Sequence, residues 1–249
     1  MIYLKNEAEI AMIARAGAII ASLYRVLPEE VEPGRSTKDL DRFAESFIRD
    51  HAGAKPAFKG LYGFPASLCT SINHEVVHGI PSERRRLKEG DVLKVDCGVK
   101  LDGFHADAAV TIPVGDVPRE TQQLLDVTRL SLKSGIEAAR PRNRLGDIGA
   151  AIQEVAEDAG YGVVRDLVGH GIGREFHEEP QVPNYGRRGR GMKLEPGLVL
   201  AIEPMLNAGT ASVRTLPDRW TVVTADGRIS AHYEHTVAVT AEGPRILTR

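Results

Sequence analysis

Residues 94–111, KVDCGVKLDGFHADAAVT, predict a β-hairpin that decides the fold. Asp102-Gly103 is a two-residue turn signal between two apolar, β-branched runs, because a type I′ turn requires positive φ at both central positions. Counting outward from this turn pairs Gly98 with Asp107. Because side chains alternate faces along a strand, Asp96 and Asp107 are expected on the same face as diagonal neighbours, roughly 7–8 Å apart at the backbone.

The two carboxylates of this hairpin have two interpretations. Two like charges side by side in an apolar strand segment are costly unless a cation holds them, which favours a metal site. Alternatively, both aspartates face water, or a one-residue bulge breaks their parity. The hairpin alone does not distinguish a metal site from these alternatives, so residues elsewhere in the chain are needed.

Length, composition and charge limit the number of domains and the kinds of partner that the protein can have. A chain of 249 residues is long enough for one large domain or two small ones and can bury roughly 70–75% of its unfolded surface. The 32 basic and 34 acidic residues give a formal charge of -2, which offers no electrostatic case for nucleic acid or membrane as the main partner.

The N-terminal residues lack the features of an export signal. Residues 1–7 have neither a basic region nor an apolar run, and no later segment has 18 uncharged apolar residues in a row. A cytoplasmic location is therefore expected. Cys69 and Cys97 are accordingly expected as free thiols, and strand alternation places the Cys97 side chain on the face opposite to Asp96, in the core.

The order of predicted elements repeats along the chain. Helical periodicity from the possible cap Asn6 to about Leu27, and again after the possible caps Ser36 and Thr37, precedes short strands and the hairpin. Helices over about 119–139 and 147–159 then precede strand-like segments at 162–167, 197–202, 220–224, 232–239 and 246–247. This order predicts an α+β domain with two similar halves, about 1–117 and 118–249, folded against one another.

Further polar groups of the second half fall in its strands and loops. Glu203 ends an apolar run that would otherwise be wholly buried, and Glu234 interrupts an alternating strand. His170 and His177 lie in a glycine-rich segment, 169–180. For either glutamate alone, a buried ion pair is an alternative to a metal site.

Taken together and in this order, the motifs resemble those of the type I methionine aminopeptidases of peptidase family M24. The resemblance spans nearly the whole chain and rests on 73–81 (NHEVVHGIP), 95–107 (VDCGVKLDGFHAD), 169–180 (GHGIGREFHEEP), 202–205 (IEPM) and 234–236 (EHT). It implies the pita-bread fold, in which two pseudo-symmetric halves form a curved antiparallel sheet covered by helices around a dinuclear metal site. It also implies five metal ligands: Asp96, Asp107, His170, Glu203 and Glu234.

The charge of this set agrees with two bound divalent cations. Four carboxylates and one neutral imidazole carry a formal charge of about -4, and an oxygen-rich set without thiolate suits Mn, Fe(II) or Co and tolerates Zn. By resemblance, Asp96 serves one metal, His170 and Glu203 serve the other, and Asp107 and Glu234 bridge them. Two bridged ions would supply a hydroxide that attacks the first peptide bond.

The resemblance also implies the activity and the remaining site residues. The expected reaction removes the initiator methionine from nascent chains when the second residue is small. His177 would donate to the scissile carbonyl oxygen, His78 would hold the substrate amide nitrogen, and Glu203 could take a proton from the attacking water. The expected methionine pocket is apolar and consists of Phe58, Leu61, Phe64, Cys69, Phe176 and Trp220.

Two of these pocket residues depart from the family pattern, because Leu61 and Phe64 stand where members often carry tyrosine. Leu61 and Phe58 could also be plain core residues. The other histidines beside the motifs, His74, His105, His232 and His235, are expected to be packing groups or to support the ligands, and His51 to lie at a helix end on the surface.

The expected partners are nascent polypeptide N-termini, bound by a monomer. The basic run 187–193 could contact ribosomal RNA transiently, or it could be a solvated loop. Two alternatives to the main assignment remain: an Xaa-Pro aminopeptidase or dipeptidase of the same fold, and a non-catalytic pita-bread protein that only binds other proteins. The first usually carries a sizeable N-terminal domain, and the second would have lost ligands.

Overall fold

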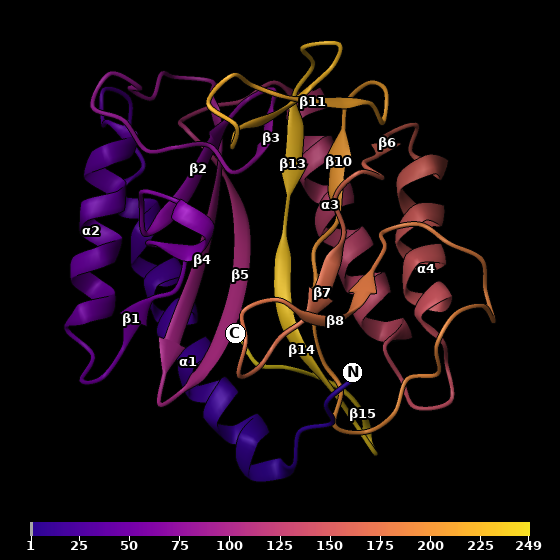
Figure 1. Ribbon diagram of the computed structural model, residues 1–249. Helices are drawn as coiled ribbons and strands as arrows, with labels where there is room; N and C mark the ends of the chain where they lie inside the picture. Colours follow the sequence, from indigo (N-terminus) through magenta and orange to yellow (C-terminus); the bar gives the residue numbers. More distant parts are fainter. Residues whose placement is uncertain (1) are drawn as a thin grey trace.

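Two pairs of helices flank a central antiparallel sheet (Figure 1). The structure is a computed structural model and describes residues 2–249. Within them the α-helices are α1 (Glu7–Val26), α2 (Thr37–Arg49), α3 (Arg119–Ala138) and α4 (Leu145–Asp158). Two short 3-10 turns are η1 (Leu27–Glu30) and η2 (Leu61–Gly63).

The central sheet has nine strands, and seven of them follow the order β1-β4-β5-β14-β9-β7-β8. The other two lie off this path, β2 beside β4 and β15 beside β14. The strands are β1 (Lys55–Pro56), β2 (Leu68–Ile72), β4 (Val92–Leu101), β5 (Phe104–Pro113), β7 (Gly169–Gly171), β8 (Glu178–Val182), β9 (Val199–Ile202), β14 (Glu234–Thr240) and β15 (Gly243–Ile246).

Two smaller sheets lie beside the central one. One has the order β13-β10-β6 and consists of β13 (Ser230–His232), β10 (Met205–Asn207) and β6 (Gly162–Val163). The other has the order β11-β12-β3 and consists of β11 (Val213–Thr215), β12 (Val222–Thr224) and β3 (Glu75–Val77). The strands predicted at 162–167 and 220–224 are thus shorter than expected, and the one predicted at 232–239 is interrupted at Tyr233 between β13 and β14.

The hairpin of β4 and β5 has the predicted register. Gly98 pairs with Asp107 without an intervening bulge, and the ladder runs from Val92↔Pro113 to Leu101↔Phe104. Asp102 and Gly103 have φ of 49° and 83°, as a type I′ turn requires. Asp96 and Asp107 therefore lie on one face of the hairpin.

The other face of the hairpin packs on α1. Cys97 is fully buried in the same core cluster as Ile13 and Ile20 of α1, which confirms it as a core thiol. The Tyr24 hydroxyl donates to the Ala108 carbonyl at 2.5 Å and lies 3.1 Å from the Val95 carbonyl, and so ties α1 to both strands. By length and composition the segment Glu7–Glu30 is long and apolar enough to cross a membrane, and half of its most apolar window is buried inside the fold.

The pairing of β5 with β14 joins the first part of the chain to the second. Glu234 pairs with Ala109 and His235 with Ala108. The Thr236 hydroxyl accepts from the Asp107 backbone N–H at 2.9 Å and donates to the Asp107 carbonyl at 2.7 Å. A single side chain thereby satisfies both backbone groups of Asp107, and the two parts of the sheet are held in fixed register.

Candidate active site and metal centre

The five predicted metal ligands lie around one cavity of about 470 Å³. Four of them project from strands of the central sheet: Asp96 from β4, Asp107 from β5, His170 from β7 and Glu234 from β14. Glu203 directly follows β9. The sheet thus brings together residues that are up to 138 positions apart in the sequence, from Asp96 to Glu234.

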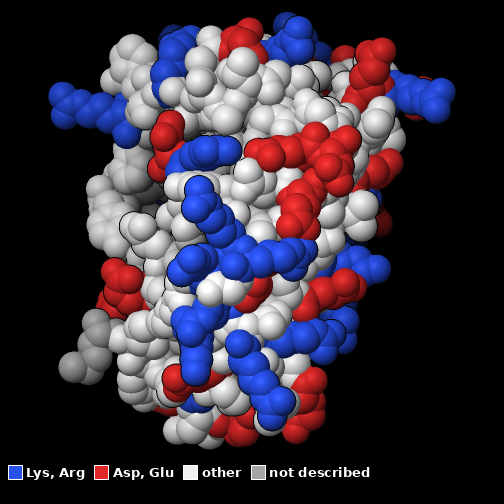
Figure 2. Space-filling view, turned by 90° about the vertical axis from the view of Figure 1, so that its right-hand side faces the viewer, with Lys and Arg blue, Asp and Glu red and all other residues white. Residues whose placement is uncertain are grey.

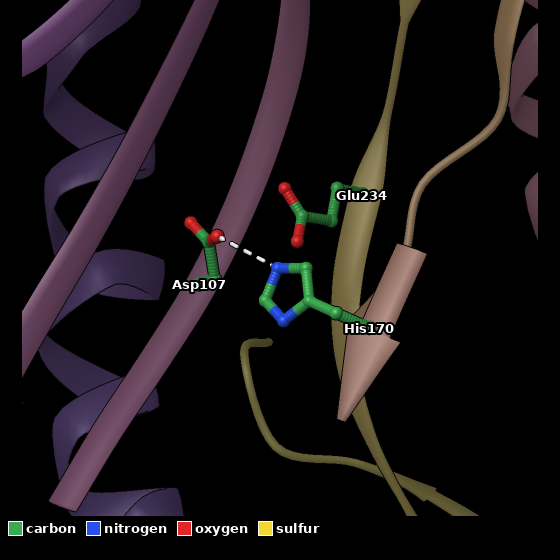
Figure 3. Close-up of side chains that lie close together, drawn as sticks. All are labelled: Asp107, His170 and Glu234. Carbon is green, nitrogen blue, oxygen red and sulfur yellow. Dashed lines mark ion pairs between the residues drawn. The ribbon is translucent and has the colours of Figure 1, made fainter. Parts of the chain in front are cut away.

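The side chains of Asp107, His170 and Glu234 point toward one another from three strands (Figure 3). One ligand atom of each lies within 4.8 Å of the others. His170 Nε2 is 3.9 Å from Asp107 Oδ2 and 3.7 Å from Glu203 Oε1. These separations leave space for an ion between the groups rather than direct hydrogen bonds.

Several carboxylate oxygens of the cavity have no hydrogen-bond partner within the described residues. They are Asp96 Oδ1, Asp107 Oδ1 and Glu234 Oε1, all buried. Burial raises the pKa of Asp96 to about 7 and that of Glu203 and Glu234 well above its usual range. The pKa of Asp107 is raised by burial and by the charges of Glu234 and Asp96. Buried, unpartnered anions of this kind are costly alone and fit a site for divalent cations.

The tautomer of His170 also fits a metal ligand. Its Nδ1–H donates to the carbonyl of Gly171 at 2.8 Å, so Nε2 carries the lone pair and faces Asp107 and Glu203. Burial, and to a lesser degree the charge of His177, lowers the pKa of His170 to about 4. The imidazole is therefore neutral at physiological pH and free to coordinate.

The two other predicted catalytic histidines line the same cavity. His177 lies in the loop between β7 and β8, and its ring centroid is 4.4 Å from that of His170. His78 directly follows β3 with a φ of 60°, and burial lowers its pKa to about 4. Neither ring belongs to the compact ligand group of Asp107, His170 and Glu234.

Every predicted pocket residue lines this cavity as well: Phe58, Leu61, Phe64, Cys69, Phe176 and Trp220. Phe58 packs edge-on against Phe176 at 5.2 Å, and Phe64 against Trp220 at 5.1 Å, between ring centroids. Burial raises the pKa of the Cys69 thiol well above its usual range, so this wall is uncharged. An apolar compartment thus adjoins the acidic one.

One contact links the sheet to the apolar wall. Gly98, which pairs with Asp107, lies directly beneath the Phe176 ring, because a Cβ atom at Gly98 would stand 2.5 Å from Phe176 Cε2. The loop that carries Phe176 is held by His105, whose backbone N–H and Nδ1–H both donate to the Gly173 carbonyl. The expectation that His105 supports the site without being a ligand agrees with this position.

Sequence reasoning missed several groups that shape the site. Lys5 donates to Glu178 at 2.5 Å and anchors the His177 loop, and Thr236 fixes the backbone of Asp107. His232, in contrast, was expected as a packing or ligand-supporting group, and it is buried with Nε2 3.8 Å from Glu203 Oε2. Tyr62 stacks on His177. Only Tyr62 had a local signal, since it lies between Gly60 and Gly63 in a turn that two glycines indicate.

Comparisons with known proteins agree with this geometry. Residues 11–241 match the model of metallopeptidase family M24. A methionine aminopeptidase of Clostridium perfringens is 56% identical over 100% of this chain and 99% of that protein, and methionine aminopeptidase 1 of Bacillus subtilis is 49% identical over all of both. The crystal structure of methionine aminopeptidase from Rickettsia prowazekii has a TM-score of 0.98 at 43% identity and 100% coverage of both chains.

More distant structures share the fold alone. The prolidase of Pyrococcus horikoshii has a TM-score of 0.80 at 23% identity, and this chain covers 63% of its length. The predicted pita-bread architecture is confirmed by both kinds of neighbour. The chain therefore belongs to metallopeptidase family M24 and, within it, to the methionine aminopeptidases.

Proposed function

We propose that this protein removes N-terminal methionine from polypeptides whose second residue is small. The observation that carries the proposal is the cavity itself, in which buried, unpartnered carboxylates adjoin an apolar compartment. The acidic part suits cations and the apolar part suits an unbranched thioether side chain. Identity of 56% to a methionine aminopeptidase over the whole chain supports the same substrate.

We propose two divalent cations as cofactors, drawn from Mn, Fe(II), Co and Zn. Asp96 would bind one, His170 and Glu203 the other, and Asp107 and Glu234 both. The lone pair on His170 Nε2 and the free oxygens of Asp96, Asp107 and Glu234 support this assignment. Bound cations would acidify a water molecule between them, so that hydroxide is available near neutral pH.

The remaining roles fall to groups that the chain itself supplies. His177 Nε2–H would donate to the carbonyl oxygen of the scissile bond as negative charge develops there. His78 would hold the amide nitrogen of that bond, and Glu203 would accept a proton from the attacking water and pass it to the leaving amine. Phe58, Leu61, Phe64, Cys69, Phe176 and Trp220 would enclose the methionine side chain.

The decisive experiment is reconstitution of metal-stripped protein with each of the four ions under anaerobic conditions. Hydrolysis of Met-Ala-Ser by at least one reconstituted form, with little hydrolysis of Ala-Pro peptides, is expected. Preference for Ala-Pro would assign the protein to the Xaa-Pro peptidases instead. Absence of hydrolysis despite two bound ions would favour the non-catalytic alternative, against which the presence of all five ligand residues already argues.

We also propose that the two halves, about 1–117 and 118–249, form a single catalytic domain that acts as a monomer in the cytoplasm. The sheet pairing of β5 with β14 across the two halves supports a single domain. Sedimentation equilibrium of the purified protein tests the monomer, and fractionation of cells tests the location. A stable dimer or a membrane-bound fraction would overturn these assignments.

The basic segment 187–193 is the proposed site of transient ribosome contact. Arg187, Arg188 and Arg190 are exposed. Figure 2 shows the side of the molecule on which α4 lies in Figure 1, and Lys and Arg side chains gather there. Arg188 pairs with Glu154 of α4, and the Gly189 N–H donates to Asp147, so this loop is held against α4.

Co-sedimentation with ribosomes at rising salt would test this contact. The double variant Arg187→Glu/Arg190→Glu should lose ribosome binding and its salt dependence while it retains hydrolysis of Met-Ala-Ser. Unchanged co-sedimentation would make the segment a solvated loop.

A further inference from the structure

Tyr62 occupies a strained and exposed position at the mouth of the cavity. Its φ is 51°, and its side chain is 73% exposed. A non-glycine residue in the left-handed region costs roughly 1–2 kcal/mol, and such strain concentrates at functional sites. The turn is fixed on both sides by backbone hydrogen bonds from Gly60 N–H to Phe64 O and from Phe64 N–H to Leu61 O. The backbone therefore presents the Tyr62 side chain to the cavity rather than to the core.

The Tyr62 ring makes two contacts with His177. The rings are stacked at 5.6 Å between centroids and 20° between planes. The Tyr62 hydroxyl lies 3.3 Å from His177 Nδ1. The His177 ring also packs against the rings of His170 and Phe176, at 4.4 Å and 4.9 Å between centroids.

The two adjacent imidazoles need opposite tautomers. In His170 the Gly171 carbonyl can only accept, so Nδ1 carries the proton and Nε2 the lone pair. His177 can donate to a substrate oxygen through Nε2 only if its Nδ1 lacks the proton or the ring is charged. A hydroxyl, unlike a carbonyl, can donate a hydrogen bond. The Tyr62 hydroxyl can therefore favour the His177 tautomer with an unprotonated Nδ1, as the Gly171 carbonyl favours the His170 tautomer with a protonated Nδ1.

We infer that Tyr62 is a positioning residue for His177: its hydroxyl donates to Nδ1 and its ring fixes the imidazole plane, so that Nε2–H faces the substrate carbonyl. This inference rests on the donor role proposed for His177. It makes the role of His177 depend on Tyr62, an exposed side chain that is not one of the six predicted residues of the methionine pocket. Without Tyr62 the imidazole could rotate about its broad χ2 minimum and exchange tautomers.

The first test reads the tautomer directly and needs no substrate. The metal-free protein, with its histidines labelled at the ring nitrogens with ¹⁵N, is measured at about pH 8.5, roughly two units above the ordinary histidine pKa. The His177 signals are assigned by their loss in His177→Gln. In the wild type Nδ1 should show the shift of an unprotonated, hydrogen-bonded nitrogen and Nε2 that of a protonated one. In Tyr62→Phe the Nδ1 signal should move toward a free or protonated nitrogen.

The second test measures catalysis of Met-Ala-Ser by the metal-loaded protein. Tyr62→Phe keeps the stacking and loses the hydroxyl, so kcat should fall about three- to tenfold with little change in KM, as for the loss of one neutral hydrogen bond. Tyr62→Ala should lower kcat further. Tyr185→Phe is the matched control, because Tyr185 lies under Arg165 and does not line the cavity.

The outcomes separate this inference from the proposed function. Unchanged ¹⁵N shifts and unchanged kcat in Tyr62→Phe would overturn the role of Tyr62 and leave the hydrolase intact. A protonated Nδ1 in the wild type would also overturn it, since the hydroxyl would then be an acceptor. Full activity of His177→Gln would instead refute the role of His177 on which the inference depends.

Discussion

The two walls of the cavity are built in different ways. The acidic wall consists of side chains on strands β4, β5, β7 and β14, whose relative positions follow from the register of one sheet. The apolar wall consists mostly of loop residues, such as Phe58, Phe176 and Trp220, whose positions depend on turns and on contacts between rings. The sheet therefore holds the charged groups in fixed positions, whereas the loops determine which side chain fits beside them.

The largest effect is expected on the acidic wall. Asp107→Asn removes a carboxylate shared by both proposed cations, so kcat/KM for Met-Ala-Ser should fall by more than about a hundredfold, beyond the loss typical of residues that only support ligands. Titration calorimetry should show fewer bound ions. Glu154→Gln, on the outer face of α4, is the control and should change neither quantity. Normal metal content in Asp107→Asn would contradict the ligand assignment.

The next effect concerns His177, which belongs to the loop wall and whose proposed role is at the reacting bond. His177→Ala should lower kcat about a hundredfold or more through the loss of a donor to the developing oxyanion, with metal content unchanged. This result would separate the His177 loop from the ligand set. A parallel loss of metal would instead make His177 a ligand, and metal binding would then not be confined to the acidic wall.

A smaller effect is expected where the two walls touch. Gly98→Ala would place a Cβ 2.5 Å from the Phe176 ring and push that ring into the proposed methionine pocket. KM for Met-Ala-Ser should rise by about tenfold, as for overpacking of a core. The double variant Gly98→Ala/Phe176→Leu should recover most of the loss, because the smaller side chain leaves space for the methyl group. Additive losses would show that the two residues do not interact.

The last effect concerns stability in the absence of metal and does not involve catalysis. The folded-state pKa of Asp96 is about 7 against an unfolded value of 3.8, so the folded protein binds the proton more tightly. The free energy of unfolding should therefore fall as the pH rises through this window. Asp107, Glu203 and Glu234, whose pKa values are also raised, act in the same direction, and the buried histidines, whose pKa is lowered, act in the opposite direction. Comparison with Asp96→Asn isolates the contribution of Asp96.

Urea unfolding at several pH values between about 4 and 8 measures this effect. Asp96→Asn should flatten the decline, and saturation of the wild type with a divalent cation should abolish it. Asp126→Asn, at an exposed position on α3, serves as the control. If the free energy of unfolding declines equally in the wild type and in Asp96→Asn, the raised pKa of Asp96 in the folded protein would be refuted.

The sequence predicts the acidic wall better than the apolar wall, for a physical reason. Turn chemistry at Asp102-Gly103 sets the register, and the register alone places Asp96 and Asp107 on one face. Pairing of β5 with β14 depends on contacts far apart in the chain. Strand and loop patterns alone therefore marked His170 and Glu234 as candidate ligands, but only the family resemblance placed them in one site with Asp96 and Asp107. The Tyr62 contact with His177 spans 115 positions and has no periodic pattern, and neither it nor the Lys5 anchor of Glu178 was predicted.

The pairing of β5 with β14 has a consequence for the order of events during synthesis. Glu234 and Thr236 are made more than 120 residues after Asp107, and the site lacks one of its carboxylates until β14 has docked. With Glu234 as a proposed ligand, a growing chain of this protein is therefore inert until β14 has left the ribosomal tunnel. Its own N-terminus, if trimmed during translation, must be trimmed by a molecule finished earlier.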